Sequence, residues 1–386
     1  MDNRKQTLIR LAGLFLRLGA TAFGGPAAHI AMMEDEVVTR RQWLSREEFL
    51  DLLGATNLIP GPNSTELAIH IGFRRAGWLG LLVAGACFIL PAALLVLGLA
   101  AVYVHLGQSP RMEGVLFGVK PVILAVVIQA LWRLAKSALK SRELLVIGVV
   151  SALANFLGGH ELLVLFSAGL IASVWLRSQH SPNELGTPRT AWVPSWPPVV
   201  AAGVVAPVAV PASVASIFGF FLKVGSVLFG SGYVLLAFLR ADLVERWGWL
   251  SEGQLLDAIA IGQFTPGPVF TTATFIGYLL GDVPGAIAAT VGIFLPAFFF
   301  VAVSGPVIPL LRRSAVAGAF LDGLNAASLA LMFVVTLRLG QGAVLNVPGL
   351  FLAAASGMLL FKTRLNSAWL VLGGAFVGIF LHRWGI

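Results

Sequence analysis

Residues 57–65 read Asn57-Leu58-Ile59-Pro60-Gly61-Pro62-Asn63-Ser64-Thr65, and residues 263–271 read Gln263-Phe264-Thr265-Pro266-Gly267-Pro268-Val269-Phe270-Thr271. Each Pro-Gly-Pro lies inside a long apolar segment, 49–73 in one case and 253–281 in the other. Proline removes a backbone donor and glycine loosens the chain, so one half-helix ends and another begins at each motif. Within a bilayer such a break is tolerated only where it is buried in protein or lines a cavity.

The composition indicates a membrane protein. Of the 386 residues, 58% are hydrophobic and only 11% are charged, and the mean hydropathy is +0.88. Soluble domains carry about a quarter charged residues, so too few charges remain here to solvate an outer surface. The net charge of +8 comes from basic residues between the apolar segments, which favours a membrane protein over a nucleic-acid-binding one.

About 13 apolar segments are candidate transmembrane helices, so the expected fold is an all-α integral membrane protein. Segments 143–157, 161–176 and 198–215 are short for a span, so the number of crossings could be lower by one or two. They are 8–33, 49–73, 77–105, 115–135, 143–157, 161–176, 198–215, 217–239, 253–281, 283–304, 316–338, 343–361 and 366–382.

An internal repeat organises these segments. Adding 206 to a residue number in the first copy gives its counterpart, so that Phe15-Leu16 meets Phe221-Leu222 and Trp43-Leu44-Ser45 meets Trp249-Leu250-Ser251. After a one-residue deletion the offset becomes 205, so that Ile71-Gly72 meets Ile276-Gly277. One register over more than a hundred positions indicates two homologous halves. We expect a first transporter repeat at 1–176, a linker with an extra helix at 177–216, and a second repeat at 217–386.

Each repeat has six candidate spans, and segment 198–215 lies between them. An odd number of crossings between two repeats turns the second one upside down, which is a transporter architecture with the substrate near the midplane. If 198–215 does not cross, the halves are parallel. Most of the 26 Lys and Arg residues fall on the cytoplasmic side if the N-terminus is cytoplasmic.

The residues after each Pro-Gly-Pro are candidate anion ligands. A helix N-terminus offers free N–H groups and a partial positive charge, and hydroxyl side chains add donors. The candidates are Asn63, Ser64 and Thr65 in the first copy, and Thr271 and Thr272 in the second. The alternative is that the motifs only kink two helices and the hydroxyls cap them.

Arg17 and Lys223 are equivalent cations on apolar segments. A buried cation in a membrane helix is functional by default, and its partner could be a transported anion. Alternatively, Arg17 extends to the membrane interface. Asp51 and Asp257 are also equivalent, and each either pairs with one of these cations or caps its helix.

Glu66 and His70 lie four residues apart on the half-helix that follows the first Pro-Gly-Pro. Such a pair could titrate and couple transport to protons, although a single structural hydrogen bond is the simpler interpretation. Lys120 and Asp322 are further candidates for lining a cavity. The one cysteine, Cys87, excludes intrachain disulfides and cysteine metal clusters. Without a phosphate-binding loop or redox motif, the sequence predicts no cofactor, no metal and no enzyme.

The motifs Phe15-Leu16-Arg17-Leu18-Gly19, Phe23-Gly24-Gly25-Pro26, Trp43-Leu44-Ser45, Asp51, Asn57, Pro60-Gly61-Pro62 and Gly72 resemble the chromate ion transporter family. The resemblance covers nearly all of the chain and its two-domain length. It implies export of chromate from the cytoplasm and chromate resistance, with sulfate as the structural analogue. The functional residues that it implies are Arg17, Phe23, Gly24, Gly25, Pro26, Asn57, Pro60, Gly61 and Pro62, with Lys223, Gly230, Pro266, Gly267 and Pro268 in the second copy.

The second copy departs from the family pattern, because Gly25-Pro26 becomes Ser231-Gly232 and Asn57 becomes Gln263. The halves are therefore not equivalent, and the substrate site leans on the first. The resemblance leaves three other functions open: a permease for sulfate or another oxyanion, a passive anion channel, and a membrane enzyme that reduces chromate. We expect the protein in the inner (plasma) membrane, with its lipid bilayer as solvent, and a homodimer is a further expectation.

Overall fold

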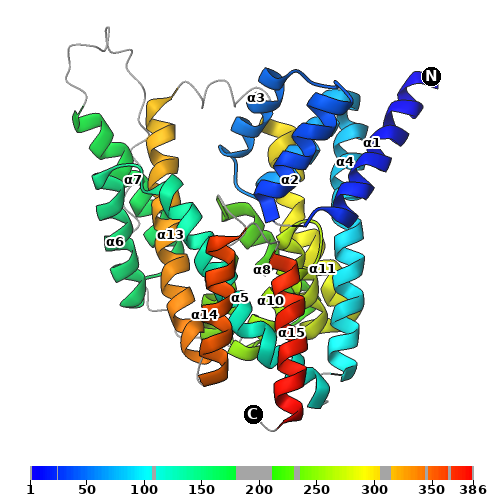
Figure 1. Cartoon of the computed structure of the whole chain (residues 1–386). Coiled ribbons are helices and arrows are strands. Elements are labelled where there is room, and N and C mark those ends of the chain that lie inside the picture. Colours follow the sequence, from blue (N-terminus) through cyan, green and yellow to red (C-terminus); the bar gives the residue numbers. More distant parts are fainter. Residues whose placement is uncertain are drawn as a thin grey trace.

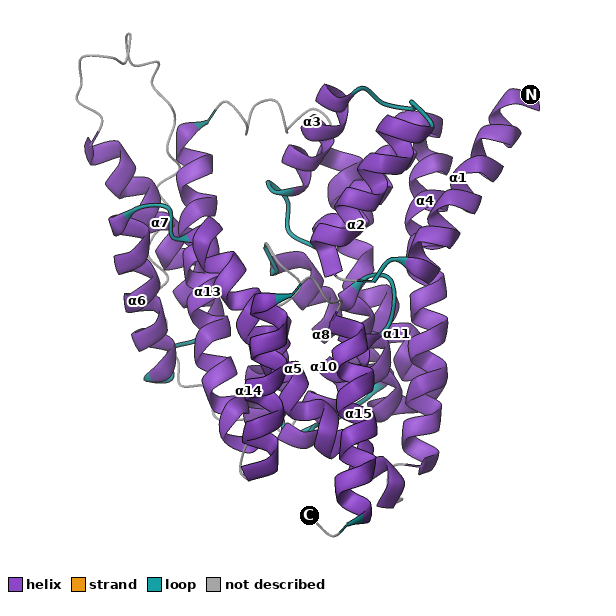
Figure 2. Ribbon diagram, viewed as in Figure 1, coloured by secondary structure: helices purple, strands orange, loops and turns teal. Residues whose placement is uncertain are grey.

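A computed structural model describes residues 2–23, 25–106, 110–179, 211–229, 235–304, 314–343, 347–363 and 367–384. Within these ranges every regular element is a helix, and Figure 2 shows helices joined by short loops. The expected all-α class is confirmed. Segment 198–215, on which the predicted inversion depends, lies outside the described residues apart from its last five positions.

The helices follow one order twice. The first half contains α1 (Asp2–Thr21), α2 (Gly25–Glu34), the π-helix η1 (Asp35–Arg40), α3 (Arg46–Thr56), α4 (Asn63–Leu106), α5 (Pro110–Ala138), α6 (Arg142–Phe156) and α7 (Glu161–Gln179). The second contains α8 (Val214–Val227), α9 (Leu235–Leu239), the π-helix η4 (Arg240–Arg246), α10 (Glu252–Phe264), the 3-10 turn η5 (Val269–Thr271), α11 (Thr272–Ser304), α13 (Ala315–Ala343), α14 (Val347–Lys362) and α15 (Ser367–Arg383).

Local chemistry begins equivalent helices in the same way. Ser45 accepts a hydrogen bond from the Glu48 N–H and the Glu48 side chain accepts one from the Ser45 N–H, which forms a capping box at the start of α3. Ser251 and Gln254 form the same box at the start of α10. The repeat in the sequence is therefore a repeat of structural elements.

Helices α4 and α11 each contain a sharp break at equivalent positions. In α4 the break lies at Ala76 (φ −143°) and Gly77 (φ 64°), and in α11 at Gly281 (φ −162°) and Asp282 (φ 51°). A positive φ is easy for glycine and uncommon for other residues, so Asp282 holds a conformation that Gly77 adopts without strain.

The two limbs of each broken helix fold back on one another. A Cβ added at Gly72 would lie 2.2 Å from the carbonyl oxygen of Gly80, and one added at Gly277 would lie 2.3 Å from that of Gly285. Residues eight apart in a continuous helix are about 12 Å apart along its axis, so these contacts require antiparallel limbs. Glycine at the crossing lets the two backbones touch.

Segment 49–73, counted from the sequence as one crossing, is a hairpin with Pro-Gly-Pro at its tip. Arg74 Nη2 lies 3.2 Å from Glu48 Oε1, so the end of the first limb of α4 returns to the start of α3. That limb, residues 63–75, is about 20 Å long, whereas the hydrocarbon core of a bilayer is about 30 Å thick. The motif therefore lies inside the molecule, between two half-length helices.

Segments 8–33 and 217–239 are also divided, between α1 and α2 and between α8 and α9. Among the described residues, four helices are long and apolar enough to cross a membrane, within α4, α5, α11 and α13. The expected count of 13 crossings is not confirmed, because a half-length helix that returns has the same composition as one that continues.

The two halves interlock. Helix α1 packs on α4 and α8 packs on α11, which is the same contact in each half, while α4 and α11 pack on each other. Beyond them, α5 of the first half packs against α14 and α15 of the second, and α13 of the second packs against α6 and α7 of the first. The largest apolar core accordingly mixes residues of both halves.

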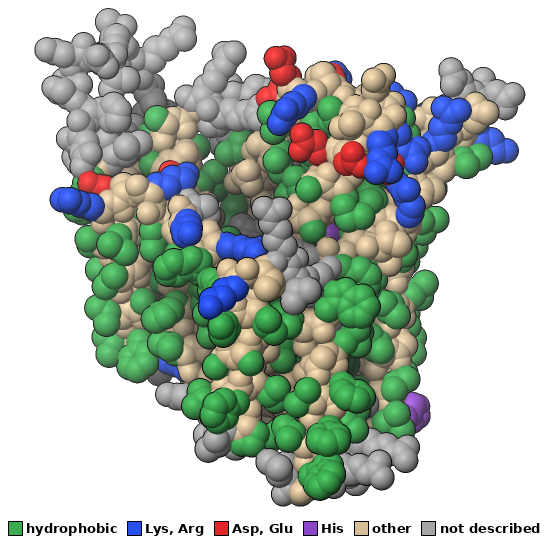
Figure 3. Space-filling model, viewed as in Figure 1, with side chains coloured by type: hydrophobic (Ala, Val, Ile, Leu, Met, Phe, Trp, Pro, Cys, Tyr) green, Lys and Arg blue, Asp and Glu red, His purple; other side chains and the backbone are tan. Residues whose placement is uncertain are grey.

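The surface matches a bilayer. On the face shown in Figure 3, charged side chains gather around α1 to α3 and in a second, mainly basic group at the left and middle, whereas the lower body is largely hydrophobic. Large apolar side chains such as Leu94, Phe299 and Phe376 are exposed on the long helices, as lipid-facing residues are. The chain begins at the upper end and finishes at the lower end (Figure 1).

Candidate functional site

The two Pro-Gly-Pro loops meet at the interface between the halves. The Gly61 N–H donates to the carbonyl oxygen of Leu228 at 2.8 Å, and the Gly267 N–H donates to that of Ala22 at 2.9 Å. Gly267 is the counterpart of Gly61, and Leu228 is the counterpart of Ala22. Each half therefore binds its loop to the end of the other half's first helix, and the two bonds are reciprocal.

Both loop glycines are required by their surroundings. Gly61 has φ 139° and Gly267 has φ 86°, which favour glycine. A Cβ at Gly61 would lie 2.3 Å from Glu66 Oε1, and one at Gly267 would lie 2.7 Å from Ala92 Cβ. The four prolines of the motifs are buried. Pro-Gly-Pro therefore forms a close contact between the halves as well as a helix break.

The start of α4 carries a cluster of buried polar atoms without hydrogen-bond partners among the described residues. They are Asn63 Oδ1, Thr65 Oγ1, both carboxyl oxygens of Glu66 and His70 Nε2. Glu66 is 0% exposed. Buried polar groups in proteins nearly always have hydrogen-bond partners. Four side chains with unpaired polar atoms on one short limb therefore indicate a place where a ligand, a proton or water completes the hydrogen bonding.

The neighbouring polar groups of the first copy are bonded. Ser64 Oγ lies 3.3 Å from His29 Nδ1, and His29 Nε2 lies 3.0 Å from the carbonyl oxygen of Ala22. Asn63 Nδ2 donates to Asn57 Oδ1 at 2.8 Å. His29, which the sequence analysis did not single out, therefore links α2 to the start of α4.

The second copy is different. The Thr271 hydroxyl donates to the carbonyl oxygen of Pro268, and that of Thr272 donates to Val269, both at 2.8 Å. These hydroxyls donate to carbonyl groups of their own turn. At the equivalent helix start, the first copy therefore has polar atoms without partners among the described residues, whereas Thr271 and Thr272 of the second copy are bonded.

Arg17 and Lys223 make equivalent ion pairs with partners that were not predicted. Arg17 Nη2 lies 2.5 Å from Glu36 Oε1, and Lys223 Nζ lies 2.6 Å from Asp242 Oδ2. Asp257, which could have paired with one of these cations or capped its helix, lies instead beside Lys120. The register offered the signal, because Glu36 and Asp242 are 206 residues apart like the cations they bind.

Glu36 is the centre of a basic cluster on η1. Arg41 Nε lies 3.1 Å and Arg40 Nη1 3.5 Å from its carboxyl oxygens, in addition to Arg17. Burial of the Glu36 side chain opposes its ionisation, but hydrogen bonds and charge from Arg17 and Arg41 hold the pKa of this carboxyl below its ordinary value. Arg17 has a half-exposed side chain, which agrees with an interfacial position.

Asp257 joins the two halves through Lys120 and Tyr103. Lys120 Nζ lies 3.2 Å from Asp257 Oδ1, and the Tyr103 hydroxyl donates to Asp257 Oδ2 at 2.8 Å. Lys120 is therefore paired rather than open to a cavity. Its companion candidate Asp322 pairs with Lys140 at 3.2 Å on the surface. Asp51, the counterpart of Asp257, is exposed on α3.

The remaining candidates lie around the turn between α1 and α2. Phe23 is 38% exposed, Gly25 begins α2 with φ 75°, and Pro26 follows it. Gly24 and Gly230 lie outside the described residues. No group of three or more His, Cys, Asp or Glu side chains that could hold a metal occurs in the described ranges.

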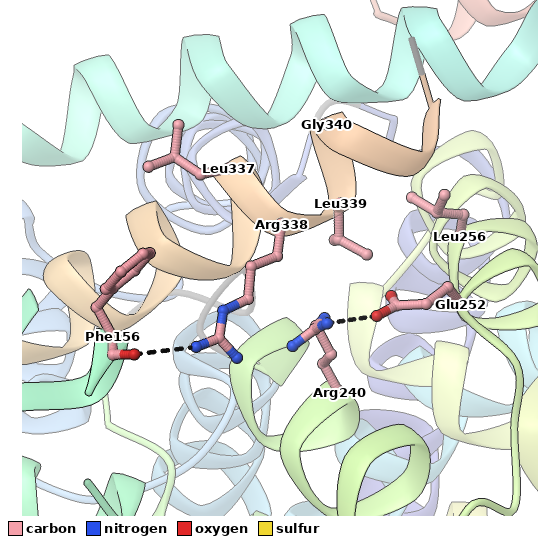
Figure 4. Close-up of a pocket in the computed structure, with 8 residues that line it drawn as sticks. All are labelled: Phe156, Arg240, Glu252, Leu256, Leu337, Arg338, Leu339 and Gly340. Carbon is pink, nitrogen blue, oxygen red and sulfur yellow. Dashed lines mark hydrogen bonds and ion pairs between the residues drawn. The ribbon is translucent and has the colours of Figure 1, made fainter. Parts of the chain in front are cut away.

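A separate cavity of about 810 Å³ opens between α6, η4, α10 and α13. Figure 4 shows its lining: Phe156, Arg240, Glu252, Leu256, Leu337, Arg338, Leu339 and Gly340. Arg240 bonds to Glu252, and Arg338 Nη2 lies 3.5 Å from the carbonyl oxygen of Phe156. The sequence analysis did not predict this site, because its residues come from four segments far apart in the chain.

Comparisons with known proteins identify the family. The sequence model of the chromate transporter family matches residues 9–173 and again residues 215–379. The chain is 34% identical over 381 residues to a chromate transport protein of Pseudomonas aeruginosa, covering 96% of this chain and 91% of the relative. It is 31% identical over 376 residues to one of Cupriavidus metallidurans, covering 97% and 93%.

A shorter relative matches only part of the chain. An uncharacterised transporter of Bacillus subtilis is 30% identical over 166 residues, which is 43% of this chain and 83% of the relative. No solved structure matches the chain. The resemblance noted from the Pro-Gly-Pro and Phe-Gly-Gly motifs is confirmed, and the apolar helices agree with a multi-pass membrane protein. The chain belongs to the chromate transporter family.

Proposed function

We propose that the protein is a secondary transporter, and not an enzyme, that exports chromate from the cytoplasm and thereby confers chromate resistance. The observation that carries the proposal is the reciprocal Pro-Gly-Pro contact between the halves, next to open polar groups at the start of α4. Relatives named chromate transport proteins along nearly the whole chain support the choice of substrate.

The energetics allow export without an ATP-driven module. Moving a divalent anion out of a negative interior gains about 4.6 kcal/mol at 100 mV, because each charge contributes about 2.3 kcal/mol. At about 1.4 kcal/mol per tenfold, this supports a roughly thousandfold gradient. The membrane potential alone is therefore a sufficient driving force.

The proposed anion site lies at the N-terminus of the first limb of α4. Backbone N–H groups there, with the side chains of Asn63, Ser64 and Thr65, bind the oxyanion, while Pro60, Gly61 and Pro62 hold the limb in place. Arg17, Phe23, Gly25, Pro26 and Asn57 form the approach to it. In the second copy Lys223, Pro266 to Pro268, Thr271 and Thr272 complete the surface across the interface. Gly24 and Gly230 are assigned from the family resemblance alone and lie outside the described residues.

Glu66 and His70 are the proposed coupling groups. A charged carboxylate beside a bound dianion would repel it, so Glu66 is neutral when the anion is bound. Release of that proton on one side of the membrane couples transport to the proton gradient. Asp51 and Asp257 contribute by positioning the equivalent helices α3 and α10.

We also propose an inverted-repeat architecture, in which repeats 1–176 and 217–386 have opposite orientations in the membrane and are joined by 177–216. The protein lies in the inner (plasma) membrane, with its N-terminus in the cytoplasm. Two features support it. The chain ends lie at opposite ends of the molecule (Figure 1), and a charged part of the surface surrounds α1 to α3 (Figure 3). Basic segments favour the cytoplasmic side.

The test compares chromate accumulation in cells that carry an empty vector, the wild type, Thr65→Val or Asn63→Ala at matched expression. Thr336→Val is the matched control, because its buried hydroxyl bonds within α13 at 2.7 Å. The protein should lower intracellular chromate, both site variants should lose most of this effect, and the control should retain it. Chromate that stays at the vector level with the wild type contradicts the proposal.

Three added measurements separate the alternatives. Excess sulfate should reduce chromate efflux if sulfate competes for the site or exchanges with chromate. Efflux that saturates and is stimulated by substrate on the opposite side contradicts a passive channel. Exported chromium that is still Cr(VI) contradicts a reductase, whereas sulfate flux without chromate flux identifies a related oxyanion permease.

A further inference from the structure

Two arginines in the lining of the cavity in Figure 4 also share the carboxylate of Glu245, which lies outside that lining. Arg338 Nη1 lies 2.6 Å from Glu245 Oε1, and Arg240 Nη1 donates to the same oxygen. Two arginines on one oxygen form the arrangement that binds oxyanions, because each guanidinium presents several donors in a fixed plane.

Both guanidinium groups are held in place independently of Glu245. Arg240 Nη2 donates to Glu252, and the guanidinium carbon of Arg338 lies 5.9 Å from the centre of the Phe156 ring. Arg338 also reaches the carbonyl oxygen of Phe156 (Figure 4). Departure of Glu245 would therefore leave two arginines oriented toward the cavity.

Glu245 is the most exposed member of this group. Its side chain is 43% exposed, compared with 12% for Arg240 and 27% for Arg338. Arg240 Nε is buried and has no acceptor among the described residues. The carboxylate is the solvent-exposed side of both ion pairs, so a dissolved dianion can reach the guanidinium groups and compete with it.

We propose that the Arg240–Arg338 pocket is a second binding site for a divalent tetrahedral oxyanion, and that Glu245 binds both guanidinium groups as an internal competitor when no anion is bound. A dianion offers oxygens to both guanidinium groups at once, whereas Glu245 offers a single one. The binding site is argued from the structure alone, and only the identification of its physiological anion as chromate rests on the proposed function.

The described residues of the first half do not repeat this arrangement of charges. The counterparts of Arg240 and Glu252 are Glu34 and Arg46, which form the same ion pair with the charges exchanged, at 3.7 Å. The position of Arg240, whose guanidinium lines the cavity in the second half, is therefore occupied by the carboxylate of Glu34 in the first half.

The test places a reporter thiol in the pocket. In a Cys87→Ala background, Glu245→Cys is labelled with an anionic methanethiosulfonate reagent in the purified full-length protein, with and without sodium sulfate at constant ionic strength. With sulfate at about ten times its Kd, occupancy predicts labelling about tenfold slower. Adding Arg338→Gln should abolish the protection.

The matched control is Glu48→Cys, whose parent carboxylate is half exposed and contacts a single arginine, Arg74. Sulfate should leave its labelling rate unchanged. Equal sulfate effects at the two thiols, or protection at Glu245→Cys that survives Arg338→Gln, would overturn the proposal. Sulfate was chosen as the probe because chromate oxidises thiols.

A second measurement needs no new thiol. Purified Glu245→Gln should bind sulfate several-fold more tightly than the wild type, because its competitor is neutral. Glu48→Gln is the control, since Gln254 makes the same capping bonds at the equivalent position. If Glu245→Gln binds sulfate no more tightly than the wild type while cells with the wild type still export chromate, the second binding site is contradicted and the proposed function is not. If binding follows the predicted order but chromate export is absent, the inference stands and the proposed function fails.

Discussion

Glu66 lies beside Gly61 with both carboxyl oxygens buried, at the point where the first Pro-Gly-Pro loop meets the second half. The sequence could predict this residue and His70 as polar groups on one face of an apolar limb. It could not predict that neither has a partner among the described residues, because that depends on which apolar side chains of other helices surround them.

Glu66→Gln tests the proposed coupling. Gln keeps the shape and polarity of the protonated acid, so we expect a folded protein that still binds chromate but no longer responds to pH in this step. Chromate uptake into inverted membrane vesicles, measured as a function of external and internal pH, checks it. A pH profile identical to that of the wild type would exclude Glu66 as the coupling group.

The partners of the two membrane cations show how far residue-level prediction extends. Arg17 and Lys223 were identified because charges are rare in apolar segments. Their counter-ions Glu36 and Asp242 fall just outside the predicted spans, on π-helices η1 and η4 that no sequence pattern indicated. Comparing the two copies position by position would have found them.

The Lys120–Asp257 pair provides a stability prediction. Removing one partner of a buried pair costs about 3–5 kcal/mol, and we expect the lower end because Lys120 is 25% exposed. Lys120→Met should therefore lower the thermal midpoint of the detergent-solubilised protein, and the double variant Lys120→Met/Asp257→Leu should recover much of it. If the double variant is less stable than Lys120→Met, the charge itself is not the cause.

At the scale of elements, the sequence predicted where helices break but not where they go. Pro-Gly-Pro identified the tips, and Arg74 and Arg75 separated segment 49–73 from 77–105. Composition cannot show that 63–75 returns to the start of α3, because a returning limb is as apolar as a crossing one. The limb length of about 20 Å was the available signal.

Close glycine contacts hold these hairpins together. Gly72→Ala would place a Cβ 2.2 Å from the carbonyl oxygen of Gly80, so the limbs of α4 must separate. We expect a loss of at least about 2 kcal/mol of stability and lower expression, since overpacking typically costs 1–3 kcal/mol. Gly98→Ala in the same helix has nothing within 4 Å and should be neutral in the same thermal assay.

At the scale of the whole molecule, the repeat predicted two halves and the structure shows that their later helices are exchanged. Packing of α5 on α14 and α15, and of α13 on α6 and α7, involves pairs far apart in sequence. These helices show no clear division into a polar and an apolar face, so the sequence does not indicate which helix each of them packs against.

This exchange predicts that the halves cannot fold separately. Chains 1–176 and 177–386, expressed together with a tag on the first, should copurify and restore chromate resistance, while either chain alone should be degraded. Membrane extraction followed by affinity purification and immunoblotting checks it. A stable, monodisperse first half on its own would contradict the interlocked packing.

The reciprocal bonds of Gly61 and Gly267 have a kinematic consequence. Each loop is fastened to the helix end that belongs to the opposite half, so displacing one loop pulls on the anchor of the other. The two hydrogen bonds therefore couple the loops mechanically. A displacement that widens the gap between the halves on one side of the centre narrows the gap on the other side.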